Sequence, residues 1–109
     1  MSKFYGTTSR KIDGKDLRFV LDFNAICHFE QTAKVNFFDS AEAWEAGKSP
    51  SGFELRAIVH AALQQNHPEL TAEDAGRILS QDMSIFSDLQ STATEGMDPA
   101  AGNAAAADA

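Results

Sequence analysis

The chain has 109 residues, of which 43% are hydrophobic and 23% charged, and its formal net charge is −7. This length fits one domain with a modest core and leaves little room for a deep catalytic cleft. The charge is uneven: residues 1–18 carry five basic and two acidic side chains, whereas residues 19–109 carry four basic and fourteen acidic ones. Because an acidic body repels phosphate backbones, we expect no nucleic-acid partner.

The sequence also indicates where the protein resides. Its beginning, MSKFYG, lacks the apolar segment of a signal peptide. No apolar run approaches the ~20 residues that span a bilayer. The single cysteine, Cys27, excludes an internal disulfide and suits a reducing compartment. We therefore expect a protein that stays in the cytoplasm and has no membrane partner.

A β-hairpin is predicted near the N-terminus, after a flexible arm over residues 1–8. Asp13-Gly14 is a strong turn signal, because glycine supplies the positive φ that a tight hairpin turn needs. We expect strands at about 9–12 and 16–21, with alternating apolar side chains on the second strand. A two-stranded hairpin is only marginally stable alone, so its apolar face must pack on other elements.

About five short helices are predicted after the hairpin. Caps and apolar spacing give the expected segments: 23–33 after Asp22, 37–46, 52–65, one after Thr71 and one after Asp82. The segment 52–65 has the clearest helical pattern. Ser51 and Glu54 form an S-x-x-E capping box at its start, and apolar residues follow at i, i+3, i+4 spacing. Gly47 ends the preceding helix as a C′ residue.

The predicted fold class is α+β and mainly α, with one globular domain over residues 9–93. The Ala-rich segment 94–109 has nothing large to pack, so we expect a disordered tail. The expected core consists of thirteen apolar residues: Leu17, Phe19, Leu21, Phe23, Ile26, Leu55, Ile58, Val59, Ala62, Leu63, Leu70, Ile78 and Leu79.

We find no catalytic, cofactor-binding or metal-binding pattern, and we expect a protein that is not an enzyme. The three histidines and Cys27 lack zinc-ligand spacing. Cys27 and His28 are no nucleophile–base pair, since neighbours on a helix point about 100° apart. There is no G-x-S-x-G elbow, Walker loop or G-x-G-x-x-G. Residues 70–79 resemble the first helix of a helix-turn-helix, but the helix that follows carries no basic residue.

Aromatic side chains gather in the second predicted helix. Phe37, Phe38 and Trp44 lie within eight residues. Two interpretations are open: these rings pack in the core, or they form an apolar patch that is exposed for a partner. The second interpretation is supported by the enrichment of aromatic residues at interface hot spots. With the exposed flank of the next helix, the candidate partner-binding residues are Phe37, Phe38, Trp44, Phe53 and Arg56.

Two stretches together resemble a known family. Residues 17–30 read as a strand running into a helix with the pattern F-x-A-I-x-x-F-E. Residues 55–63 contain L-R-A-I, and residues 67–79 contain L-T-A-E-D-A-G. This order over residues 10–80 is similar to that of the tail assembly chaperones of gene transfer agents and siphophages, which are sometimes labelled phage tail tube proteins.

The resemblance implies a non-enzymatic role in virion assembly. Members of this family bind the tape measure protein, a long helical polypeptide, and keep it soluble until the tail tube polymerises around it. The expected partners are the tape measure protein or other tail proteins, with a homo-oligomer as a further possibility. The expected location is the bacterial host's cytoplasm and not the mature virion. The alternative is a structural component, such as a tail tube, terminator or head–tail connector protein, that assembles as a ring.

Overall fold

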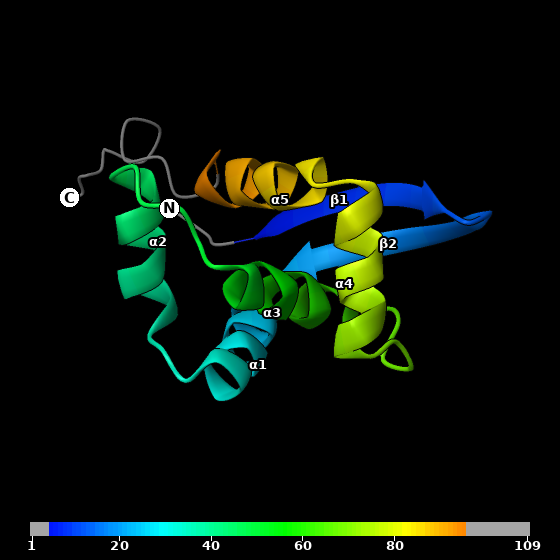
Figure 1. The fold of residues 1–109 in the computed structure, drawn as a ribbon, viewed down its shortest axis with the longest axis horizontal. Coiled ribbons are helices and arrows are strands. Elements are labelled where there is room, and N and C mark those ends of the chain that lie inside the picture. Colours follow the sequence, from blue (N-terminus) through cyan, green and yellow to red (C-terminus); the bar gives the residue numbers. More distant parts are fainter. Residues whose placement is uncertain (1–4, 96–109) are drawn as a thin grey trace.

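The computed structural model describes residues 5–95 of the chain, with side chains up to residue 91. Residues 5–95 form two strands and five helices (Figure 1), which are β1 (Gly6–Ile12), β2 (Lys15–Leu21), α1 (Phe23–Ala33), α2 (Phe37–Glu45), α3 (Gly52–Leu63), α4 (Ala72–Gln81) and α5 (Ser84–Glu95). The predicted class, an N-terminal hairpin followed by short helices, is confirmed. No helix within residues 5–95 has the length and apolar character needed to cross a bilayer.

The hairpin turns at the predicted residues. Asp13 and Gly14 have φ values of 53° and 80°, and positive φ at both central residues is the requirement of a type I′ turn. The strands pair in antiparallel register from Ile12 opposite Lys15 to Gly6 opposite Leu21. β1 therefore begins three residues earlier than predicted, and residues 6–8 belong to the sheet and not to an arm.

Caps at the helix starts explain why the predicted helices form. The Asp22 carboxylate accepts a hydrogen bond from the Ala25 amide at 3.0 Å. Reciprocal capping boxes join Ser51 to Glu54 and Thr71 to Asp74. Each cap satisfies amide groups that have no partner inside the helix. α1 has the predicted bounds, whereas α2 and α3 end one and two residues earlier than expected.

The core lies between one face of the hairpin and the helices. α1 and α3 pack together beneath β2, α5 lies along β1, and α4 crosses α3 (Figure 1). Ten of the thirteen predicted core residues are buried, and Leu55 and Leu70 are partly buried against them. Phe23 is the error: its side chain is 59% exposed. The largest residues that the prediction missed are Phe29, Phe37, Ile85 and Leu89.

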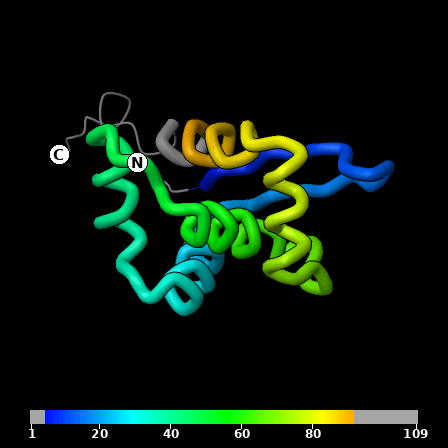
Figure 2. The backbone as a smooth tube through the Cα atoms, viewed as in Figure 1, coloured from blue at the N-terminus to red at the C-terminus, as the bar shows by residue number. Residues whose placement is uncertain are grey.

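α2 stands at one end of the molecule, away from the hairpin turn (Figure 2). The connection from α1 contains Lys34, which has a positive φ of 60°. The connection to α3 contains Gly47, which has a φ of 102°. The predicted disordered tail over 94–109 lies outside the described residues, except for residues 94 and 95, which belong to α5. Residues 1–4 of the predicted arm also lie outside the described residues.

Candidate partner-binding surface

Phe37 belongs to the core and not to an exposed surface. Its side chain is 4% exposed, and its ring packs edge-on against Phe29 and Trp44 at centroid distances of 5.8 and 6.2 Å. The Phe37 amide donates to the Glu30 carboxylate at 2.9 Å, which ties the start of α2 to α1. For this residue, the core interpretation of the aromatic cluster holds.

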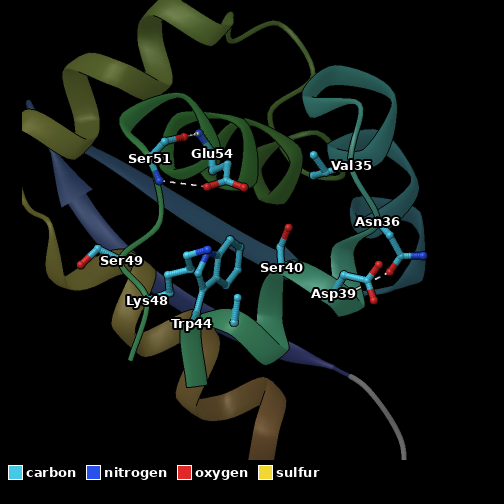
Figure 3. Close-up of a pocket in the computed structure, with 10 residues that line it drawn as sticks. Val35, Asn36, Asp39, Ser40, Trp44, Lys48, Ser49, Ser51 and Glu54 are labelled. Atoms are coloured by element: carbon cyan, nitrogen blue, oxygen red, sulfur yellow. Dashed lines mark hydrogen bonds between the residues drawn. The ribbon is translucent and has the colours of Figure 1, made fainter. Parts of the chain in front are cut away.

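Trp44 has two roles at once. One side of its ring contacts the core, with centroid distances of 6.4 Å to Phe29 and 5.4 Å to Phe86. The residue is half-buried, and its other side lines an open groove between α2 and the start of α3 (Figure 3). Trp44 is therefore a predicted partner-binding residue that lies at a concave surface.

We call this concavity the α2–α3 groove. Its volume is about 570 Å³, and its lining residues are Val35, Asn36, Asp39, Ser40, Ala43, Trp44, Lys48, Ser49, Ser51 and Glu54. The lining residues from the N-cap of α2 to Trp44 follow i, i+3, i+4, i+7, i+8 spacing, so one face of the helix forms one wall. A volume of this size lies within the range of ligand-binding pockets.

The two walls are held by backbone and cap geometry. The amides of Gly47 and Lys48 donate to the carbonyls of Trp44 and Ala43, both at 3.0 Å. These bonds form a Schellman motif that reverses the chain after α2 and starts the second wall. On that wall the Ser51 amide donates to the Glu54 carboxylate at 2.9 Å (Figure 3). The groove is thus preformed by local structure at both sides.

The groove combines an aromatic surface with polar and acidic walls. Asp39 and Glu54 contribute carboxylates, whereas Lys48 is the cation among the lining residues. The remaining lining residues are polar or apolar: Asn36, Ser40, Ser49, Ser51, Val35 and Ala43. Such a surface suits a partner with both apolar and cationic groups, since a partner would cover the carboxylates, and a covered carboxylate without a countercharge is costly.

Phe38 and Phe23 form an exposed aromatic pair outside the groove. Their ring centroids are 6.0 Å apart, and their side chains are 42% and 59% exposed. Helical spacing with Ile26 indicated a core position for Phe23. The buried face of α1 is instead formed by Ala25, Ile26 and Phe29, and at 100° per residue Phe23 lies roughly 110° from the mean direction of these three residues.

Phe53 and Arg56, the last two predicted site residues, lie elsewhere on α3. Phe53 is 49% exposed, and the Arg56 guanidinium carbon lies 5.8 Å from its ring centroid. The Arg56 stem also packs against α4, where a Cβ at Gly76 would meet its Cδ at 3.3 Å. Neither residue lines the groove. The five predicted residues therefore do not form one surface.

The titratable residues offer a weaker candidate site. The rings of His28 and His60 meet edge-on between α1 and α3, with centroids 5.0 Å apart. Burial, followed by repulsion from His60, lowers the pKa of His28. His28 Nδ1 is buried and has no hydrogen-bond partner among the described residues. Within this part of the chain, no group of three or more His, Cys, Asp or Glu side chains could hold a metal ion.

Comparisons with known proteins add no identification. No protein-family model, no curated protein and no solved structure matches the chain significantly. A functional assignment therefore depends on the motifs of residues 10–80 and on the geometry of the surface.

Proposed function

We propose that the protein is a phage or prophage tail assembly chaperone that binds the tape measure protein during tail morphogenesis. The motifs of residues 10–80 suggest the family. The observation that carries the proposal is the α2–α3 groove, in which the half-buried Trp44 provides an aromatic surface open to a partner. In this proposal the protein acts in the cytoplasm of the bacterial host, without enzymatic activity or cofactor, and leaves before the virion matures.

The physical properties of the groove suit a helical client. Helix-in-groove recognition places the apolar face of an amphipathic helix against apolar side chains, which Val35, Ala43 and Trp44 supply in this groove. The α2 wall of the groove runs from Asn36 to Trp44, and at 1.5 Å per residue this is about two turns of helix. An interface of this length is modest, which favours reversible release. The net charge of −7 favours solubility of the loaded complex.

A structural virion component is the second candidate. The observation that favours it is the exposed pair of Phe23 and Phe38, since aromatic residues are enriched at protein–protein interfaces. A ring-forming component would bury this pair between copies of the chain. It would also remain in the finished particle, whereas a chaperone would be absent from it.

Co-expression with a candidate client tests the proposal. The client is the product of an adjacent long, helix-rich open reading frame, and the readout is its solubility and co-elution in affinity capture and size exclusion. We expect the client to be soluble only with this protein. If the solubility of the client does not depend on this protein, and this protein alone forms a stable hexamer or larger ring, the structural proposal would replace the chaperone proposal.

A matched pair of variants locates the interaction. Ala43→Gln fills the groove from α2 with a long neutral side chain that suits a helix. Ala46→Gln makes the same change at the exposed C-cap of α2, outside the groove. We expect the first variant to reduce client capture and the second to retain it. Equal capture by both variants would mean that the client binds another surface.

A further inference from the structure

The charge of the α2 region suggests what kind of client segment the groove accepts. Asp39 and Glu54 line the groove, and Lys48 is the cation among its lining residues. α2 also carries Glu42 and Glu45, which are exposed, and has no basic residue in its last turn. The lining residues therefore carry a formal charge of −1, and the two exposed glutamates of α2 add to it, in a chain whose net charge is −7.

Trp44 adds a feature that cations favour. The face of an indole ring attracts ammonium and guanidinium groups more strongly than the rings of phenylalanine and tyrosine do. The long stems of lysine and arginine also pack along apolar surfaces while the charged group stays at a polar edge. A groove with one tryptophan and two carboxylates matches both parts of such a side chain.

We propose that the α2–α3 groove binds a basic amphipathic helix of the client, with a lysine or arginine side chain of that helix against Trp44 and the carboxylates of Asp39 and Glu54. The inference deepens the proposed function and rests on it, because it takes the occupant to be a segment of a helical client. The chemistry that recognises the segment is an apolar stripe flanked by basic residues, and about two turns fit along α2.

Two synthetic peptides test this inference on the full chain. Each has about 18 residues, long enough for a helix, with the same Leu and Ala stripe and no tryptophan; one carries lysine at every flanking position and the other glutamate. Trp44 is the protein's single tryptophan, so its fluorescence reports on the groove directly. We expect the lysine peptide to shift the Trp44 emission in a saturable way that weakens with salt, and the glutamate peptide to leave it unchanged.

Two double variants separate the groove from general charge attraction. Asp39→Asn with Glu54→Gln removes two negative charges from the groove, and the amide oxygen introduced at position 54 can still accept the hydrogen bond of the Ser51 amide. Glu42→Gln with Glu45→Gln removes two charges from exposed positions of α2 outside the groove. We expect the first pair to weaken lysine-peptide binding about tenfold at low salt, and the second pair by less than about threefold.

The outcomes distinguish this inference from the proposed function. An equal loss of binding in both double variants would overturn the inference, because long-range attraction would then explain the affinity. An unshifted Trp44 emission while the client still co-elutes would also overturn it and leave the chaperone function standing. If neither the peptide nor the client binds, the proposed function itself fails.

Discussion

The hairpin end and the α2 end of this molecule are held to the core by different interactions. At the hairpin end, Arg10 of β1 donates a hydrogen bond to Asp82 at 2.8 Å and also pairs with Asp88 of α5. At the α2 end, the rings of Phe37 and Trp44 pack edge-on against the body, and the Phe37 amide donates to the Glu30 carboxylate. Ion pairs between side chains hold one end, whereas packed rings and a hydrogen bond to a carboxylate hold the other.

The α2 end also carries the α2–α3 groove. The α2–α3 groove lies between a helix held largely by rings and a helix start held by its cap. Variants at either end, and at the residues that join them, test whether the two ends contribute independently to stability and to the groove.

The largest effect is expected at Phe29, which lies in the core and supports α2. Its ring is fully buried and contacts both Phe37 and Trp44. Phe29→Ala should lower the free energy of unfolding by about 3–5 kcal/mol, because a large cavity opens in the core. Chemical denaturation measures this loss. A loss below about 1 kcal/mol would show that the aromatic cluster contributes little to folding.

The next effect is expected at Arg10. Arg10→Met keeps an apolar stem but leaves Asp82 and Asp88 without their cation. The melting temperature should fall, by less than in Phe29→Ala, while the Trp44 emission stays the same. A shifted emission would contradict the independence of the two ends.

Arg10→Met should also change the pH dependence of stability. Hydrogen bonds from Ser84, and then from Arg10, lower the pKa of Asp82 below its usual value of 3.8. A lowered carboxyl pKa stabilises the fold above that value and loses its contribution as the pH falls through the folded-state pKa. Denaturation at several acidic pH values should therefore show a weaker acid dependence in Arg10→Met than in the parent protein.

A smaller effect is expected from two matched helix caps. Ser51→Ala and Thr71→Ala each remove the side-chain acceptor of a capping box, and each should cost about 1 kcal/mol of stability. Ser51 lines the groove, whereas Thr71 does not. Ser51→Ala should therefore change the Trp44 emission and Thr71→Ala should not. Identical emission in both variants would show that the α3 cap does not shape the groove.

The smallest effect is expected from the histidine pair. The pKa of His28 is lowered from its usual 6.5 by burial and then by His60. The folded protein therefore binds this proton less readily than the unfolded chain, so stability is complete above about pH 6.5 and declines as the pH falls below it. His28→Gln should flatten this decline between about pH 7 and pH 5 in thermal denaturation. An unchanged slope would assign the decline to other groups.

The sequence alone determined the elements of the fold. The Asp13-Gly14 turn and the caps at Asp22, Ser51 and Thr71 are local signals, because each side chain acts on backbone groups within a few residues. The spacing of apolar residues likewise identified ten of the buried core positions. The missed residues 6–8 are polar or small, and they form a strand because they pair with β2.

The roles of the aromatic residues depend on tertiary packing. Phe37 and Phe38 are neighbours in sequence, yet one is buried and the other exposed, because the orientation of α2 turns one ring toward Phe29. The groove depends on the same orientation, since Trp44 and Glu54 lie on different helices. The sequence shows how many aromatic side chains there are, but not which way each one points. Their directions are fixed only when distant segments pack, and this packing separates the buried rings from those that can contact a partner.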